Sequence, residues 1–271
     1  MAPVAGTLAT TPEAGFCVND VHCHFLPSVD DGARDLEEAV ALLRLAHRDG
    51  VRRAVLTPHV FPGRWDNQLS NLRPRFDAFR RFVASEGIAV QLFLGAEVHL
   101  LPESMELLDA GELPFIGGWE GKPVLLLELS DGRIPIGALN AVQFLSKRGI
   151  VPMIAHPERN RAVMVDPLLI QPFVEAGCLL QLTAASVVGG FGERAARASH
   201  WLIDRGWAAL VASDAHNLIH RPPMMTAARR YLQAQYGEAA ALLLTESSPA
   251  KVIDGRQALN LDAANADSTI A

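Results

Sequence analysis

Histidine and carboxylate side chains recur at short spacings in two separate stretches of the sequence. His22 and His24 lie two residues apart in "DVHCHF", and Asp214 and His216 repeat that spacing in "SDAHN". On an extended chain, residues two apart point to the same side, so each pair can direct two ligand atoms at one ion. Because buried imidazole and carboxylate groups need partners, the repeated pattern predicts a metal centre.

Single candidate ligands follow further apolar runs, at His59, Glu97, Glu128 and His156. A carboxylate that closes an apolar run is costly unless it is paired, so Glu97 and Glu128 are expected to contact cations, in a bridging position between them. His99 shares a face with Glu97 and is expected beside the centre. The ligand set has nitrogen and oxygen without sulfur, which favours manganese, iron or catalytic zinc, and its size implies two or three ions.

The adjacent Asp30 and Asp31 leave two roles open, because a helix is predicted directly after them. Either aspartate can be the N-cap of that helix, and the other can then be a metal ligand. Arg159 follows His156 by three residues in "AHPERNR". Its guanidinium group suits a phosphate held by the same metals, and the alternative is an ordinary surface arginine. Arg133, Arg161 and Arg221 are expected in loops on the same face.

Apolar runs alternate with helical patterns along most of the chain. The predicted strands cover 16–22, 53–57, 89–98, 123–129, 151–155, 178–183 and 209–213, and the predicted helices cover 36–50, 69–86, 103–110, 137–148, 167–176, 193–205, 221–236 and 249–258. Such alternation is typical of a parallel sheet with helices outside. Carboxyl ends of barrel strands meet at one face, whereas a doubly wound sheet spreads them along a line, so a single-domain α/β barrel is favoured. The barrel domain is assigned to 16–261, with disordered or flexible segments at 1–15 and 262–271.

Composition narrows the range of partners. The 271 residues carry a formal net charge of -6 without long runs of like charge, so nucleic acid and anionic membranes are not favoured. Three scattered cysteines suit neither a disulfide framework nor a thiolate zinc site, and neither a signal peptide nor a membrane span is evident. A cytoplasmic location and no stable membrane insertion are expected.

The motif series resembles the polymerase-and-histidinol-phosphatase (PHP) superfamily, on the segments "DVHCHFLPSVDDGARDLEEA", "TPHV", "GAEV", "LLLEL", "AHPERN" and "SDAHN". Among its branches the sequence is most similar to the CpsB/CapC family of bacterial manganese-dependent protein-tyrosine phosphatases of capsule and exopolysaccharide loci. The resemblance implies a distorted (β/α)7 TIM-like barrel with a trinuclear site. It implies one ion at His22, His24, Glu97 and Asp214, a second at Asp31, His59 and His216, and a third at Glu97, Glu128 and His156.

The resemblance also implies a reaction and a substrate. Water activated at the metals would attack phosphorus in line, with Arg159 as the catalytic arginine and Arg221 as a second arginine on the phosphate. The implied substrate is the phosphotyrosine-containing tail of a bacterial tyrosine kinase that controls polysaccharide synthesis. The oligomeric state stays open.

Two other functions are compatible with the same motifs. One is a small-molecule phosphoesterase such as a histidinol-phosphate phosphatase, and another is a non-enzymatic, metal-stabilised regulatory partner. A nuclease is disfavoured by the lack of basic runs. A cysteine-dependent phosphatase is excluded, because the arginine that a C-x5-R loop requires after Cys23 would fall on Val29.

Overall fold

Two parallel sheets form the centre of the protein. The computed structural model describes residues 16–130 and 132–262. The first sheet has the strand order β1-β2-β4, and the second has the order β10-β9-β8-β7-β5-β3, with β6 pairing antiparallel to β7. The strands are β1 (Val18–Cys23), β2 (Val51–Leu56), β3 (His59–Val60), β4 (Gln91–Leu94), β5 (Glu97–His99), β6 (Gly117–Trp119), β7 (Lys122–Glu128), β8 (Val151–Ala155), β9 (Leu179–Thr183) and β10 (Ala208–Ala212).

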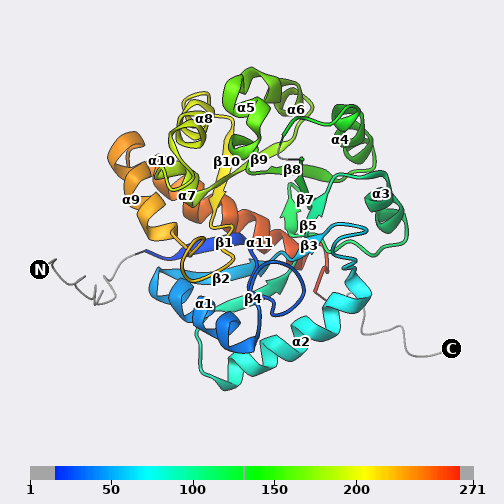
Figure 1. Ribbon diagram of the computed structural model, residues 1–271, viewed down its shortest axis with the longest axis vertical. Helices are drawn as coiled ribbons and strands as arrows, with labels where there is room; N and C mark the ends of the chain where they lie inside the picture. The colour runs from blue at the N-terminus through cyan, green and yellow to red at the C-terminus, as the bar shows by residue number, and fades with distance from the viewer. Residues whose placement is uncertain (1–15, 131, 263–271) are drawn as a thin grey trace, which may run out of the picture.

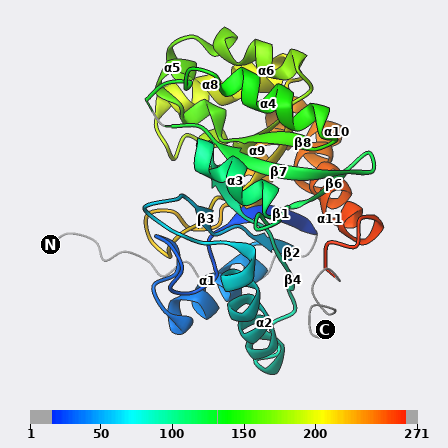
Figure 2. The same cartoon turned by 90° about the vertical axis from the view of Figure 1, so that its right-hand side faces the viewer.

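Backbone hydrogen bonds connect the two sheets at both edges. On one side the Asp214 N–H donates to the His22 carbonyl at 2.8 Å and the His24 N–H donates to the Ala215 carbonyl at 2.9 Å, which joins the end of β10 to β1. On the other side the Gly95 N–H donates to the Leu56 carbonyl at 2.8 Å, where β2 and β4 lead into β3 and β5. The strand ends of both sheets therefore lie close together (Figure 2).

Most helices surround the strands on the outside, whereas the last helix crosses the middle of the molecule behind them (Figure 1). Strands buried on both faces need this cover, and β1 and most of β7 to β9 are buried along their length. The helices are α1 (Leu36–Arg48), α2 (Leu69–Ser85), α3 (Pro102–Asp109), α4 (Ala138–Lys147), α5 (Arg161–Val165), α6 (Gln171–Glu175), α7 (Ala184–Val187), α8 (Glu193–Asp204), α9 (Met225–Tyr236), α10 (Glu238–Leu242) and α11 (Ser248–Ala258), with short 3-10 turns η1 (Pro157–Arg159) and η2 (Pro167–Ile170) and a π-helical turn η3 (Leu243–Ser247). The expected single α/β domain with parallel strands is confirmed.

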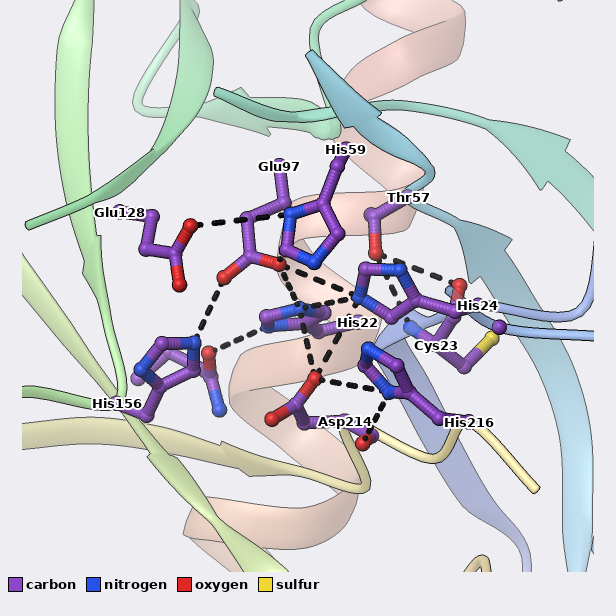
Figure 3. Close-up of polar contacts among 12 residues, drawn as sticks. His22, Cys23, His24, Thr57, His59, Glu97, Glu128, His156, Asp214 and His216 are labelled. Carbon is purple, nitrogen blue, oxygen red and sulfur yellow. Dashed lines mark hydrogen bonds and ion pairs between the residues drawn. The ribbon is translucent and has the colours of Figure 1, made fainter. Parts of the chain in front are cut away.

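A second, smaller apolar core lies between the two sheets. It consists of strand residues, Ile116 directly before β6, and two residues of α11: Val21, Val55, Ile116, Val124, Leu126, Met153, Ala155, Leu210, Ala212, Val252 and Ile253. Helix α11 packs closely on β6, because a Cβ atom on Gly117 would lie 2.1 Å from the Val252 carbonyl oxygen. This packing fixes α11 against the strands on the side away from the metal-ligand candidates (Figure 3).

Some predicted boundaries were wrong. The predicted strand 89–98 is two strands, β4 and β5, in different sheets, and the break between them includes Gly95, where a Cβ would meet Ile116 Cγ2 at 2.8 Å. Helix α9 begins at Met225 instead of Arg221, because Pro222 and Pro223 come between them and disfavour helical backbone before them. The short β3 and β6 were not predicted.

The predicted terminal segments fall almost wholly outside the described residues. Residues 1–15 and 263–271 are not described, and Asp262 accepts a hydrogen bond from Arg256 Nη2 at 2.7 Å. Within the described part of the chain, no helix has the length and apolar character that crossing a membrane requires.

Candidate metal centre

The predicted metal ligands come together where the strands end (Figure 3). His22 belongs to β1, and His24 follows it directly. His59 begins β3, Glu97 begins β5, Glu128 ends β7, and His156 follows β8. Asp214 and His216 follow β10, which lies beside β1. Three groups of these side chains have ligand atoms that all lie within 4.8 Å of one another.

The first group is His22, His24, Glu97 and Asp214, and all four side chains are fully buried. Glu97 Oε2 lies 3.1 Å from His22 Nε2 and 3.2 Å from His24 Nε2. Asp214 Oδ1 lies 3.3 and 3.5 Å from the same two nitrogens. These are the same four residues that the family resemblance assigns to one ion.

The second group adds Asp31, His59 and His216 around His24. Asp31 Oδ1 lies 3.4 Å from His59 Nε2 and 3.5 Å from His216 Nε2. The Asp31 side chain is 46% exposed, whereas the two histidines are buried. The centre therefore opens to solvent on the Asp31 side.

The third group is His59, Glu97 and Glu128. It differs from the expected set, which had His156 in place of His59. His156 Nε2 instead lies 2.7 Å from the other Glu97 oxygen, Oε1. Glu97 thus belongs to two groups and contacts His156 as well, which is the arrangement of a carboxylate between cations. Glu128 also contacts His99, whose Nδ1 lies 3.2 Å from Glu128 Oε2, so His99 lies beside the centre as expected.

Three of the histidines are oriented by a partner on Nδ1. His22 Nδ1 lies 2.8 Å from Gln181 Oε1, His24 Nδ1 lies 2.8 Å from Asp30 Oδ2, and His216 Nδ1 lies 3.0 Å from the Asp214 carbonyl. Donation from Nδ1 to an oxygen leaves the lone pair on Nε2, which in each case faces the centre. These contacts are those that metal-ligating histidines characteristically have.

Asp30 is one of these partners, and the alternative that Asp30 or Asp31 caps the next helix was wrong. The N-cap of α1 is Asp35, whose side chain accepts from the Glu38 N–H at 2.8 Å. Asp30 instead accepts from the His59 N–H at 2.9 Å and the Gly32 N–H at 2.9 Å, besides His24.

Backbone strain coincides with the centre. His156 and Asp214 both have left-handed backbone conformations, with φ values of 30° and 50°. Such residues cost about 1 to 3 kcal/mol each and persist where their surroundings hold them. In these backbone conformations the His156 side chain contacts Glu97, and the Asp214 side chain faces His22 and His24.

Buried polar atoms without hydrogen bonds test whether the site suits cations. His59 Nδ1, Glu97 Oε2, Asp214 Oδ1 and His216 Nε2 are all buried, and none has a hydrogen-bond partner within the described residues. Unsatisfied buried polar atoms are rare and costly in folded proteins. All four are candidate ligand atoms that point into the same centre, so the residues present fit a group of divalent cations.

Opposite charges at the centre shift the pKa values of its carboxyl and imidazole groups. Burial opposes ionisation of Asp214 and Glu97, but His22 and the surrounding cationic groups outweigh it and hold the pKa of both carboxyl groups well below the usual range. Burial likewise opposes protonation of His24, but Asp30 and the other carboxylates raise its pKa well above the usual value. Without metal, protonated histidines therefore offset the charge of the buried carboxylates. A bound cation would displace these protons.

Two arginines contact the same carboxylate at this centre. Arg159 and Arg221 both donate to Asp214 Oδ2, the oxygen that faces away from His22 and His24. Both guanidinium groups also lie over the Phe191 ring, with their Cζ atoms 4.5 and 6.0 Å from its centroid. Each arginine side chain is about one-fifth exposed, so both can reach a bound anion.

Sequence reasoning missed several residues at the site. Gln181 lies in the middle of a predicted strand and Phe191 lies in a predicted loop, so their contacts depend on the fold. Trp65 stacks on the His59 ring with a centroid distance of 4.8 Å and an interplanar angle of 9°. For Asp30 a signal existed, because two adjacent aspartates after a histidine pair leave one available to orient an imidazole.

Parallel strands with a cluster of histidines and carboxylates at their ends define a class of α/β protein with a candidate multinuclear metal centre. Within that class, the chain belongs to the family described as "Capsular polysaccharide synthesis, CpsB/CapC", whose sequence model matches residues 18–254.

Individual relatives agree with this membership. The chain is 31% identical over 229 residues to the tyrosine-protein phosphatase YwqE of Bacillus subtilis, covering 84% of this chain and 89% of YwqE. It is 32% identical over 221 residues to the putative tyrosine-protein phosphatase CapC of Staphylococcus aureus, covering 81% and 86% of the two chains. A solved structure from work on YwqE and Streptococcus pneumoniae CpsB, described there as unique metal-dependent tyrosine phosphatases, superposes with a TM-score of 0.80 at 31% identity. That match covers 86% of this chain and 94% of the solved one.

Proposed function

We propose that this protein is a metal-dependent tyrosine phosphatase that hydrolyses phosphotyrosine at the candidate metal centre. The observation that carries the proposal is the contact of two arginines with Asp214, a carboxylate that also faces His22 and His24. Positive charge from two guanidinium groups beside a metal-ligand cluster suits a phosphate group. The names of the related proteins support the same reaction.

The proposed ligand sets follow the groups in the structure. His22, His24, Glu97 and Asp214 would hold one ion, and Asp31, His59 and His216 would hold a second. Glu97, Glu128 and His156 would hold a third, with His59 close enough to share it. Bound divalent cations supply positive charge that lowers the pKa of water and neutralises phosphate oxygens.

The arginines have a separate role in this proposal. Arg159 and Arg221 would exchange part of their contact with Asp214 for the phosphate oxygens, and Phe191 would keep both guanidinium planes in place. Arg159 lies in η1 directly after the ligand His156, so its position is tied to the centre. Charge that develops on the phosphoryl oxygens would then meet preorganised donors.

Several finer assignments belong to the same proposal. We assign manganese as the metal, in two or three ions, with iron or zinc as the other metals that this ligand set suits. The proposed substrate is the phosphotyrosine-containing tail of a bacterial tyrosine kinase, and the proposed location is the cytoplasm. The two connected sheets would form a distorted (β/α)7 barrel that spans residues 16–261.

Phosphate release tests this proposal. Wild-type protein with manganese is assayed on a phosphotyrosyl peptide and on histidinol phosphate, beside Arg159→Ala and Asp214→Ala. The matched control is Arg197→Ala, which removes a surface arginine on α8 that pairs only with Glu193 in the described structure. We expect turnover of the peptide, a loss of about 100-fold or more in both site variants, and wild-type rates in the control.

Two results would change the assignment. A higher kcat/KM for histidinol phosphate than for the peptide would make the protein a small-molecule phosphoesterase. No turnover of either substrate with manganese, iron or zinc would favour a non-enzymatic regulatory role.

A further inference from the structure

A short hairpin projects from the metal centre directly after β3. Its ends are joined by two backbone hydrogen bonds between Phe61 and Trp65, at 3.1 and 2.8 Å. Gly63 has a φ of 83°, which favours glycine, and its N–H donates to Asp66 Oδ1 at 2.6 Å. These contacts give the hairpin one defined shape.

Aromatic stacking fixes the hairpin to the centre at two points. Trp65 stacks on the candidate ligand His59, and Phe61 stacks on His99 with a centroid distance of 4.1 Å and an interplanar angle of 1°. His99 in turn contacts Glu128. The hairpin therefore has a fixed position relative to any substrate at the metals.

Arg64 lies at the tip of this hairpin. Its guanidinium carbon lies over the Trp65 ring, 4.1 Å from the centroid, and the residue is exposed. Because Trp65 stacks directly on His59, the guanidinium group lies within about 9 Å of the His59 ring. No ion pair to Arg64 occurs within residues 16–130 and 132–262, although the protein as a whole carries a net charge of -6.

We propose that Arg64 is a specificity-determining residue that binds an acidic side chain flanking the phosphotyrosine of a substrate peptide. This inference rests on the proposed phosphatase function and adds the class of peptide that the site prefers. An extended peptide rises about 3.3 Å per residue, so a side chain one to three positions from the phosphotyrosine can reach across this distance. Arg159 and Arg221 are engaged at Asp214, whereas Arg64 has no carboxylate partner among the described residues and lies over Trp65, on the His59 side of the centre.

The stack also explains why an exposed arginine could discriminate between peptides. A long side chain normally loses conformational entropy when it forms an ion pair, which reduces the gain. Packing on the Trp65 indole restricts the Arg64 side chain before the peptide binds. An exposed ion pair contributes about 0.2 to 1 kcal/mol, so we expect about a 1.4- to fivefold preference in kcat/KM.

The test uses three phosphotyrosyl peptides that differ only in whether the flanking positions carry Glu, Gln or Lys. The wild-type protein and the variants Arg64→Gln and Arg64→Glu are assayed with manganese at low and high salt. Because all peptides use the same centre in one preparation, any change in metal content cancels in the ratio of kcat/KM values. The matched control is Arg205→Glu, since Arg205 also lies over a tryptophan ring, Trp201, at 4.5 Å, but precedes β10 and so lies at the opposite ends of the strands.

The expected results have a defined order. Wild-type protein and Arg205→Glu prefer the Glu peptide over the Gln peptide, and high salt weakens that preference. Arg64→Gln loses the preference, and Arg64→Glu reverses it in favour of the Lys peptide. Equal rates for all three peptides, or an unchanged preference in Arg64→Glu, would refute the inference while the phosphatase function stands. No turnover of any phosphotyrosyl peptide would refute both proposals.

Discussion

Asp30→Asn tests whether the residues around the candidate ligands prepare them for metal. The Asp30 side chain is fully buried, and its two oxygens accept three hydrogen bonds: Oδ2 from His24 Nδ1 and from the His59 N–H, and Oδ1 from the Gly32 N–H. Asparagine has one acceptor oxygen, so its NH2 group must face a donor on one side or the other. The substitution keeps the shape of the side chain and removes its charge.

The magnitude follows from these contacts. Loss of a carboxylate that orients a metal-ligating histidine typically lowers metal affinity about 10- to 100-fold. In the metal-free protein, a buried donor left without an acceptor costs about 1 to 3 kcal/mol of unfolding free energy. We therefore expect Asp30→Asn to weaken manganese binding at least 10-fold and to lower the unfolding free energy by at least 1 kcal/mol.

Chelator competition measures the manganese affinity, and urea denaturation of the metal-free protein measures the unfolding free energy. The affinity is measured at pH 8, where protons compete less for His24. Asp35→Asn is the matched control, because asparagine and aspartate are equally good N-caps and α1 begins outside the centre. Manganese affinity within threefold of the wild type in Asp30→Asn would refute the role of Asp30 in holding His24.

Three further substitutions test other parts of the structure. Gly32→Ala would place a Cβ 2.2 Å from the His24 carbonyl oxygen, so we expect weaker manganese binding than in Asp30→Asn by the same chelator assay. Burial raises the pKa of Asp49 to about 6, so the wild-type protein should lose stability as the pH rises from about 4 to 6. In urea titrations of metal-free protein, Asp49→Asn should therefore be more stable than the wild type by about 1 kcal/mol at pH 8. Below pH 4 the variant should show no such gain. Arg256 is buried and donates to three backbone carbonyls, so Arg256→Met should cost about 3 kcal/mol or more in the same titrations, while Arg197→Met on the surface should cost less than about 0.5.

The grouping of histidines and carboxylates could be predicted because parallel strands place their carboxyl ends at one edge. Apolar runs located β1, β7, β8, β9 and β10, and ligand candidates lay at or just after the ends of β1, β7, β8 and β10, whereas His59 and Glu97 begin β3 and β5. The periodicity could not show that one apolar run is divided at Gly95 between two sheets, since the sheet that each half joins depends on its neighbouring strands in the fold. Strands of two or three residues, such as β3 and β6, are too short to give a periodic signal.

The residues that support the ligands were harder to predict. Gln181 reaches His22 only through the three-dimensional arrangement, because a glutamine inside a strand has no sequence pattern of its own, whereas the adjacent aspartates gave a signal for the contact of Asp30 with His24. The stack of Arg64, Trp65 and His59 likewise depends on the hairpin that follows β3. Residue types and spacing thus predicted the chemistry of the site, while the contacts that orient its side chains required the fold.

The most direct test of the account is the rate of phosphate release from a phosphotyrosyl peptide, measured as metal-free protein is reconstituted with manganese and the bound metal per chain is counted. We predict no activity without metal, a rise in rate as two or three ions bind, and a joint loss of bound metal and activity in His22→Ala. Full activity in metal-free protein, or unchanged metal content and activity in His22→Ala, would contradict the central claim that this cluster is a metal-dependent phosphatase site.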